Sequence, residues 1–468
     1  MTPMAAPDLK RLFQPRSIAI IGASQDELKS GGMFISSLLK DGYTGSIYPI
    51  NRKEAEIMSL TSYAGVLDVP EDVDLAVMAI PARNVPQAMA DCARKGVRFA
   101  IVHSVGFSEL GVEGKALEHE MLEAARAGGV RVVGPNCMGI VSPRARINTI
   151  VPYIRMSLEP GGVAFVGQSG WACEAMLRLG SERGLRFSGV ISIGNQSDLV
   201  IEDFLEYFGD DAETSVIAFY IEGIKQARRF FKLAGEVSAR KPIIVLKGGS
   251  SDLGARAAAS HTGSIAGNYA LFDTLSRQTG IISARSMDQL IDLTVAFSCP
   301  CLPDGNEVGL LIEAGGGAVA ASDACARAGL NVPPLPETAQ RRLREFLKDR
   351  IPPSPSLANP VDLVWTPFNE TAQIYSTCLE IMAAEVDSCL LMCYAPIDDD
   401  SLLSGLQKIR DGMNKPIFVV PGNSLDQRAG MSKTTRLGIP AFAMPDSAVM
   451  ALAALVRRAE YLRSLREC

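Results

Sequence analysis

One histidine of this chain stands where phosphoryl or charge transfer is chemically feasible. His261 precedes Thr262, Gly263 and Ser264, in a loop that follows an apolar run at residues 242–246. An imidazole is the usual side chain for taking a charge or a phosphoryl group near neutral pH. Small residues allow a close approach of the backbone, and a loop that feeds a helix offers unpaired N–H groups to an anion. The pattern indicates a catalytic histidine beside a phosphate; a merely solvated loop histidine is the alternative.

Two further candidate groups follow other apolar runs. Glu222 comes after the run at residues 216–220, where a carboxylate could orient an imidazole ring and stabilise its charged form. A solvated glutamate at a strand end is the alternative. Ser169 and Gly170 also follow an apolar run, but Trp171 stands where a Gly-x-Ser-x-Gly nucleophile elbow needs glycine. We therefore expect Ser169 and Gly170 to lie at an anion-binding helix N-terminus rather than in a hydrolase site.

The amino-terminal part carries a third set of candidates, which we expect to form one ligand groove. The loop at Gly22 is in a phosphate-cradle position, but its spacing is not G-x-G-x-x-G, so a nicotinamide dinucleotide is not favoured. Arg52 and Lys53 suit a phosphorylated ribose better than the acidic residue that NAD needs. Each loop alone is also explained by ordinary turn chemistry. The residues of the expected groove are Gly22, Ala23, Ser24, Lys29, Asn51, Lys53, Ile80, Pro81, Ser104, Gly106, Asn136 and Cys137.

Parallel strands are needed to bring such loops to one edge of a sheet. Apolar runs alternate with helix-length segments, which predicts α/β units with doubly wound parallel sheets that bind ligands at the carboxyl ends of their strands. In the first unit the expected strands are residues 17–21, 46–50, 75–80, 99–104 and 130–133, and the expected helices are residues 85–95 and 114–127. The same strand, glycine turn and helix recur near residues 163 and 308. We therefore expect three domains, at residues 1–151, 152–300 and 301–468.

Composition excludes several classes of protein. The 468 residues are 47% hydrophobic, yet no apolar stretch is long enough for a membrane span, and the first residues lack a signal-peptide core. A cytoplasmic protein is expected. The net charge of −6 argues against a nucleic-acid partner. The ten cysteines are scattered without zinc-ligand spacing, so we expect neither a metal site nor a disulfide framework.

Taken in order and spacing, several stretches resemble the NDP-forming acyl-CoA synthetases. The resemblance covers nearly the whole chain and is close to the α subunit of ADP-forming acetyl-CoA synthetase, more distantly to the α subunit of succinyl-CoA synthetase. The stretches that carry it include Gly134-Pro135-Asn136-Cys137-Met138-Gly139, Gln168-Ser169-Gly170, Tyr220-Ile221-Glu222-Gly223, Ser260-His261-Thr262-Gly263-Ser264 and Asn359-Pro360-Val361-Asp362.

The resemblance implies a fold, a site and a reaction. It implies a Rossmann-like CoA-binding domain followed by two flavodoxin-like domains of the succinyl-CoA-synthetase type. His261 corresponds to the family's phosphohistidine and Glu222 to the glutamate that holds it. Ser169 and Gly170 would flank the phosphate on one side, and Thr262 to Ser264 on the other. The implied reaction is reversible: acyl-CoA and phosphate give acyl phosphate and CoA, and the phosphoryl group passes to His261 and then to ADP.

Two departures from the family pattern shape the remaining expectations. The sequence ends at Cys468 without an ATP-grasp module or a Walker-type loop, so we expect ADP or ATP and Mg²⁺ to bind on a separate ATP-grasp β subunit, in an α2β2-like hetero-oligomer. Trp171 stands where relatives often have alanine, which could change the choice of small carboxylic acid. A CoA- or acyl-CoA-binding sensor or scaffold without phosphoryl transfer is the alternative function. The presence of both His261 and Glu222 favours the enzyme, because binding alone needs neither.

Overall fold

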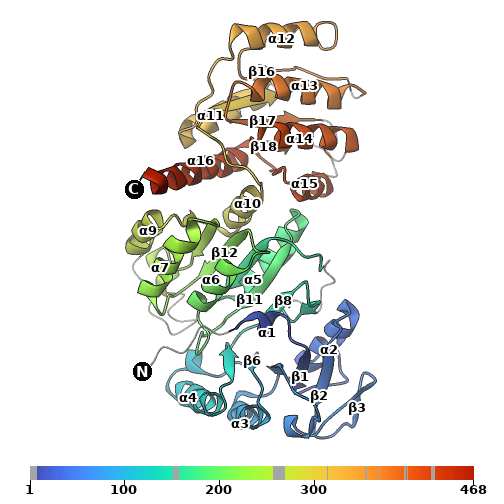
Figure 1. The fold of residues 1–468 in the computed structure, drawn as a ribbon, viewed down its shortest axis with the longest axis vertical. Helices are drawn as coiled ribbons and strands as arrows, with labels where there is room; N and C mark the ends of the chain where they lie inside the picture. Colours follow the sequence, from blue (N-terminus) through green and yellow to red (C-terminus); the bar gives the residue numbers. More distant parts are fainter. Residues whose placement is uncertain are drawn as a thin grey trace. The chain divides into compact units, whose positions relative to one another are not determined.

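A computed structural model of the chain describes most of its residues (Figure 1). The described residues are 8–150, 158–256, 269–313, 315–353, 356–367, 369–394, 397, 399–422 and 427–467. The chain divides into two compact units, Met1–Leu177 with Arg186–Arg285, and Arg178–Leu185 with Ser286–Cys468. Among the described residues, no helix has both the length and the apolar character needed to cross a membrane.

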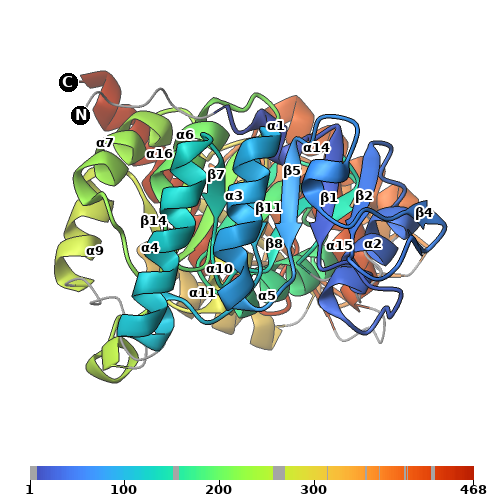
Figure 2. The same cartoon turned by 90° about the horizontal axis from the view of Figure 1, so that it is seen from below.

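The first sheet of the first unit is parallel throughout. Its strands follow the order β2-β1-β5-β6-β7. Strands β1 and β5 are buried along their whole length and apolar except for Ser17, as expected for a sheet covered on both faces. Helices α3 and α4 pack side by side over this sheet (Figure 2). The elements are α1 Lys10–Phe13, β1 Ser17–Ile21, α2 Ser30–Asp41, β2 Ser46–Ile50, the hairpin β3 Glu56–Ile57 and β4 Leu60–Thr61, β5 Leu75–Met78, α3 Val85–Lys95, β6 Phe99–Val102, α4 Val112–Ala127 and β7 Arg131–Val133, with 3-10 helices η1 Val66–Asp68, η2 Ala82–Asn84 and η3 Ser108–Leu110.

The second sheet of this unit has the order β14-β13-β12-β10-β11-β8-β9. Strands β10 to β14 are parallel, whereas β8 runs antiparallel to β11, and β9 antiparallel to β8. The elements are β8 Gly139–Ser142, β9 Ile147–Asn148, β10 Val163–Gly167, α5 Gly170–Glu182, β11 Phe187–Ser192, α6 Ile201–Asp210, β12 Val216–Ile221, α7 Ala227–Ser238, β13 Ile243–Lys247, α9 Tyr269–Gln278 and β14 Ile282–Ala284.

The β8–β9 hairpin differs from the expected domain limits. A limit at residue 151 assigns both strands to the first domain, but they extend the second sheet. Strand β8 is apolar and buried, and its pairing covers the edge that β11 would otherwise expose. A single apolar core accordingly runs from Ile20 of β1 through Ile140 of β8 to Val166 of β10. The two expected domains of this part of the chain share their core, and the three-domain division stays a prediction.

The second unit has a smaller parallel sheet of order β16-β15-β17-β18. Its core is separate and includes Leu311, Tyr375, Leu391 and Val419. Helices α10 and α11 both pack against the long carboxyl-terminal helix α16. The elements are α10 Met287–Phe297, β15 Val308–Ile312, α11 Gly315–Ala328, α12 Glu337–Leu347, β16 Val361–Asp362, α13 Thr371–Ala383, β17 Ser388–Cys393, α14 Asp400–Met413, β18 Ile417–Pro421, α15 Gln427–Arg436 and α16 Pro445–Glu467.

The three sheets share one topological feature that positions the site. In each sheet, the second parallel strand along the chain lies on one side of the first, and the third lies on the other side. The strand order therefore reverses between β1 and β5, between β10 and β12, and between β15 and β17. Loops that leave the carboxyl ends of such a strand pair diverge and leave a crevice for a ligand. The fold class predicted from the sequence, a Rossmann-like domain followed by flavodoxin-like domains, is confirmed.

Candidate functional site

One side chain connects two neighbouring strands at the switch point of the second sheet. Gln168 follows β10, and its Oε1 accepts hydrogen bonds from the backbone N–H groups of Glu222 and Gly223, the latter at 2.8 Å. Its Nε2 donates to the carbonyl oxygen of Gly223 at 2.8 Å. This amide therefore joins the ends of β10 and β12 and holds Glu222 at a fixed place beside the start of α5.

Helix α5 begins two residues after Gln168. The helix begins at Gly170, and the backbone N–H of Cys173 donates to the carbonyl oxygen of Ser169 at 3.2 Å. A Cβ atom on Gly170 would lie 2.4 Å from the Sδ of Met138, so only glycine fits here without displacing its neighbour. The first N–H groups of a helix lack partners within the helix and carry its positive dipole end. Ser169 and Gly170 thus lie at a helix N-terminus, and the binding of an anion there stays a prediction.

Glu222 is buried, and a lysine binds its backbone. Its residue is 8% exposed, and the Nζ of Lys247 donates to its carbonyl oxygen at 2.7 Å and to that of Gly248 at 2.6 Å. Burial lowers the pKa of Lys247, and the negative charge of Glu222 opposes this shift. Burial, followed by the charge of Glu222, raises the pKa of Tyr220 to about 12. Low solvent access thus strengthens electrostatic interactions around Glu222.

The predicted catalytic loop lies beyond what the structure describes. His261, Thr262, Gly263 and Ser264 all fall outside the described residues. The described chain before them leaves β13, the neighbour of β12, through Gly248. A Cβ atom on Gly248 would lie 3.4 Å from the Cγ of Glu222, so this turn lies directly against the glutamate. The chain thus passes Glu222 before it continues toward His261.

The crevice of the first sheet contains a cavity of about 500 Å³. Four of the predicted groove residues line it: Gly22, Asn51, Lys53 and Ile80. Arg52 and Arg83 line it as well. The lining thus contains three cationic side chains and a single carboxylate, that of Asp91, which forms an ion pair with Arg94. Guanidinium and ammonium groups are the usual partners of phosphate groups. The cavity suits a ligand that carries several phosphates.

Backbone geometry explains why this cavity is open. Gly22 has φ +92°, and a Cβ atom there would lie 2.4 Å from the carbonyl oxygen of Ala79, so a glycine is required. Asn51 connects the two neighbouring loops, because its Nδ2 donates to the carbonyl oxygen of Ala23 at 2.8 Å and its Oδ1 accepts from the N–H of Lys53 at 2.8 Å. Asn51 therefore places Lys53 at the cavity.

The other residues of the expected groove lie around this edge without lining the cavity: Ala23, Ser24, Lys29, Pro81, Ser104, Gly106, Asn136 and Cys137. Most bond within the protein. Ser104 donates to the carbonyl oxygen of Ile80, and its own carbonyl accepts from the N–H of Asn136 at 3.0 Å. Burial raises the pKa of the Cys137 thiol to about 12, so this thiol is inert at neutral pH. Asn136 connects this edge to the loop that follows β11 of the second sheet, because its Nδ2 donates a hydrogen bond to the Oδ1 of Asn195 at 3.4 Å.

Sequence reasoning missed four side chains of these two crevices. Gln168, Tyr220 and Lys247 organise the second sheet, and Arg83 lines the cavity of the first. A lysine that ends a buried apolar strand, and an arginine just after Ile80-Pro81 at a strand end, were the available signals. The described part of the chain contains no group of three or more His, Cys, Asp or Glu side chains arranged to hold a metal ion.

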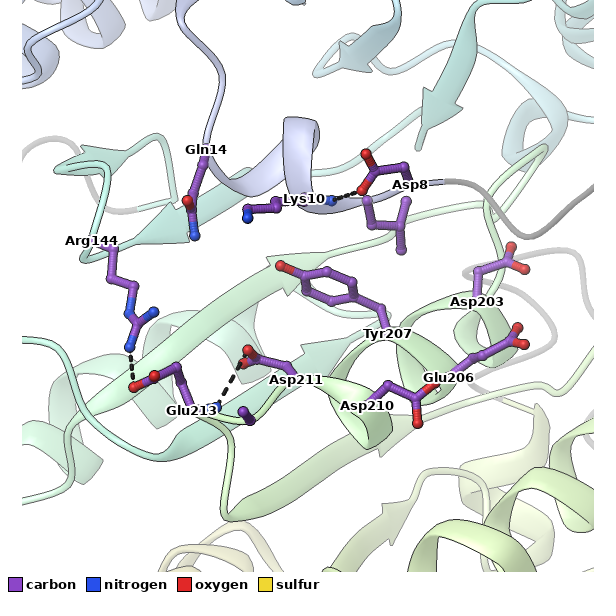
Figure 3. Close-up of a pocket in the computed structure, with 12 residues that line it drawn as sticks. Asp8, Lys10, Gln14, Arg144, Asp203, Glu206, Tyr207, Asp210, Asp211 and Glu213 are labelled. Carbon is purple, nitrogen blue, oxygen red and sulfur yellow. Dashed lines mark hydrogen bonds and ion pairs between the residues drawn. The ribbon is translucent and has the colours of Figure 1, made fainter.

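A second cavity, of about 600 Å³, has the opposite charge (Figure 3). It lies between the segment around α1 and helix α6, and carboxylates dominate its lining. Asp203 and Glu206 are bound by Arg229 at 2.7 and 2.6 Å, and Arg144 pairs with Glu213. Carboxylates repel phosphate, so this cavity does not suit a phosphorylated ligand.

Comparisons with known proteins agree with this geometry. Residues 16–143 match the family of CoA binding domains, and residues 160–297 match the family described as a succinyl-CoA ligase like flavodoxin domain. The chain is 35% identical to the acetate–CoA ligase [ADP-forming] II subunit alpha of Pyrococcus furiosus, over 97% of this chain and 98% of that protein. It is 36% identical to the acetate–CoA ligase [ADP-forming] I of Archaeoglobus fulgidus, over 96% of this chain and 63% of that protein.

A solved structure extends the comparison to three dimensions. The dinucleotide forming acetyl-coenzyme A synthetase 1 of Ca. Korarchaeum cryptofilum, in complex with phosphate and ADP, matches with a TM-score of 0.88 at 34% sequence identity. The match covers 98% of each chain.

Proposed function

The chain belongs to the family of ADP-forming acetate–CoA ligases, and we propose from this premise that it is the α-type subunit of an acid–CoA ligase. The proposed reaction is reversible: acyl-CoA, phosphate and ADP give acid, CoA and ATP. The observation that carries the proposal is the crevice of the second sheet. There Gln168 joins an open helix N-terminus to the buried carboxylate of Glu222.

The proposed chemistry has three steps. A phosphate oxygen attacks the thioester carbonyl of acyl-CoA, and the CoA sulfur leaves, which gives an acyl phosphate. A ring nitrogen of His261 then attacks the phosphorus, and the carboxylate leaves as the free acid. ADP finally takes the phosphoryl group from His261. Such a covalent intermediate divides one difficult displacement into easier steps.

The chain's own residues would act on charge and orientation in these steps. The N–H groups that follow Ser169 and Gly170 would orient the phosphoryl oxygens and stabilise the negative charge that they carry. The Glu222 carboxylate accepts a hydrogen bond from the second ring nitrogen of His261 and thereby favours the cationic ring. Thr262, Gly263 and Ser264 complete the phosphate site in the same loop.

We propose the cavity of the first sheet as the CoA site. Arg52, Lys53 and Arg83 supply the positive charge that the phosphates of CoA require. Ser24 and Lys29 lie on the loop that follows β1, on the side where the pyrophosphate would lie. The match of residues 16–143 to CoA binding domains supports this assignment.

The nucleotide half of the reaction is assigned to a partner. The Pyrococcus furiosus relative, which matches over nearly its whole length, is named a subunit alpha, and this supports a second subunit here. We propose an ATP-grasp β subunit that binds ADP or ATP with Mg²⁺, in an α2β2-like assembly.

The test is reconstitution of the full reaction. The chain with an ATP-grasp β subunit should make ATP from acetyl-CoA, phosphate and ADP. His261→Ala should lower this rate by at least about 10³-fold, because the phosphoryl acceptor is lost. His119→Ala is the matched control, since this histidine lies on the exposed surface of α4, and it should retain full activity. CoA binding without ATP formation from any acyl-CoA would point to a sensor or scaffold instead.

A further inference from the structure

An aromatic pair, the exposed Trp171 and the half-buried Tyr220, lies at the switch point of the second sheet. Trp171 is the second residue of α5, directly after Gly170, and it is 62% exposed. Its indole meets the ring of Tyr220 edge to face, with centroids 6.5 Å apart and an interplanar angle of 79°. An indole held at a crevice rather than in a core is a large apolar surface available to a ligand.

This pair continues directly from the proposed phosphoryl site. Tyr220 lies on β12 and Glu222 directly follows this strand, two residues further on, and the side chains of residues two apart in extended chain leave the same face. A Cβ atom on Gly248 would lie 3.0 Å from the Oη of Tyr220, so the absent side chain leaves room beside the phenol. A carboxylate, a phenol ring and an indole ring therefore follow one another outward from the base of the crevice.

We propose that Trp171 and Tyr220 form the wall that receives the acyl group, and that this wall favours carboxylic acids with an aromatic ring over acetate. The inference rests on the proposed function and names the substrate class of the same site. The reacting carboxyl group has to meet the phosphoryl group at the N-terminus of α5. The rest of the acid then extends past the residue that follows Gly170, and that residue is Trp171.

The size of the acid decides whether it reaches this wall. The methyl group of acetate offers little apolar surface for contact with the two rings. A planar ring gains from the indole both the burial of apolar surface and the favourable geometry of an aromatic contact. The wall therefore discriminates between acids by the size and shape of the part of the acid that lies away from its reacting carboxyl group.

The decisive experiment compares two acids in the complex with the β subunit. The kcat/KM of phenylacetate relative to acetate should exceed one in the wild type and fall at least about tenfold in Trp171→Ala. Trp171→Phe should restore most of the ratio, because a ring remains. Trp365→Ala is the control, since this second tryptophan is also exposed, at 54%, and should leave the ratio unchanged.

A binding measurement gives an independent readout. The chain has two tryptophans, so Trp365→Phe leaves Trp171 as the sole indole. Its fluorescence should change with phenylacetyl-CoA and much less with acetyl-CoA. An equal ratio of the two acids in wild type and Trp171→Ala would overturn the inference and leave the proposed function intact. A uniform loss for both acids together with weaker binding of the β subunit would make the indole an interface residue, and would also overturn it. No turnover of any acid by the wild-type complex would overturn the proposed function itself.

Discussion

The crevices of the second and third sheets are built alike but carry different charge. In the second sheet, Gln168 follows β10, and its side chain accepts hydrogen bonds from the backbone N–H groups that follow β12. In the third sheet, Glu313 stands at the corresponding position after β15, and its Oε2 accepts from the N–H of Tyr394, after β17, at 2.6 Å. A helix begins with glycine shortly after each of these residues, at Gly170 and Gly315.

The difference lies in where the carboxylate is placed. Glu313 is 6% exposed, and its other oxygen accepts from the hydroxyl of Thr366, so the third sheet holds an anion of its own close to the helix start. In the second sheet a neutral amide makes the same connection, and the carboxylate is that of Glu222, directly after the neighbouring strand β12. The positive end of α5 therefore stays available to an external anion, whereas that of α11 has a carboxylate nearby. The same scaffold thus leaves a helix N-terminus for the proposed phosphate site in the second sheet and places a carboxylate of its own at that point in the third.

Among the variants of the described residues, the largest effect on phosphorylation is expected at Glu222, and it distinguishes this glutamate from other buried carboxylates. Glu222→Gln should lower the rate of phosphorylation by about 10²-fold or more, because an amide cannot stabilise a cationic imidazole. Glu202→Gln is the matched control: this glutamate is also fully buried in the first unit, where it accepts from the N–H of Gln226 at 2.9 Å. It should affect stability but not phosphorylation per folded molecule. Equal rates in Glu222→Gln and wild type, measured by single-turnover labelling, would make Glu222 a structural residue.

Reciprocal exchange of the two connecting residues tests the comparison itself. Gln168→Glu should weaken phosphate binding by about thirtyfold, since a second carboxylate next to Glu222 repels phosphate by about 2 kcal/mol at an effective dielectric constant of ~20. Glu313→Gln should change phosphate binding less than about threefold, but should lower the free energy of unfolding by about 1–3 kcal/mol, because one of its two hydrogen bonds is lost. The KM for phosphate and urea unfolding measure the two effects. Similar losses of phosphate affinity in both variants would contradict the comparison.

The first sheet offers a smaller test of the same principle, that charge decides which crevice binds phosphate. Arg83→Ala should weaken CoA binding by about five- to tenfold, with a loss that shrinks at high salt, because an exposed charge–phosphate contact is screened. Arg144→Ala, in the acidic cavity, should bind CoA as the wild type does. Calorimetry with CoA checks both. A larger loss of CoA affinity in Arg144→Ala than in Arg83→Ala would mean that CoA binds in the acidic cavity, and would contradict the proposed CoA site.

The smallest expected effect concerns pH. Burial lowers the pKa of His103, while its hydrogen bond from Nδ1 to the carbonyl oxygen of Cys137, at 2.9 Å, opposes the shift. Between the lowered pKa and the ordinary value of 6.5 the unfolded chain binds more protons than the folded one, so stability falls as the pH falls through this window. His103→Gln should remove this part of the pH dependence, as measured by thermal unfolding at a series of pH values. An unchanged profile would show that His103 does not titrate there.

Much of the fold was predictable because local signals agreed with the tertiary structure. Helix α3 has the predicted bounds, Val85–Lys95: Pro86 lies in its first turn, and Gly96, with φ +80°, ends it. Strands β1, β2 and β15 were apolar runs that end in turn residues. The β8–β9 hairpin was not predictable in its place, because its partner is the edge of β11, and nothing local in the sequence specifies a distant partner strand.

The site was predictable in outline only. Glu222, Ser169 and Gly170 end adjacent parallel strands or begin a helix, so an apolar run followed by a polar residue was enough to indicate them. The connection through Gln168 depends on β10 and β12 being neighbours, which the order of elements along the chain does not reveal. The contact of Lys247 with the backbone of Glu222 depends on the pairing of β12 with β13 in the same way. The role of His261 stays a prediction.

The central claim is that a phosphoryl group passes through His261 beside the crevice of the second sheet. The most direct measurement is to incubate the chain and its β subunit with acetyl-CoA and phosphate, digest at alkaline pH, and locate the phosphoryl group by mass spectrometry. The account predicts a single acid-labile phosphoryl group, on the peptide that contains His261. A phosphoryl group on another residue, or continued ATP formation with none on His261, would contradict it.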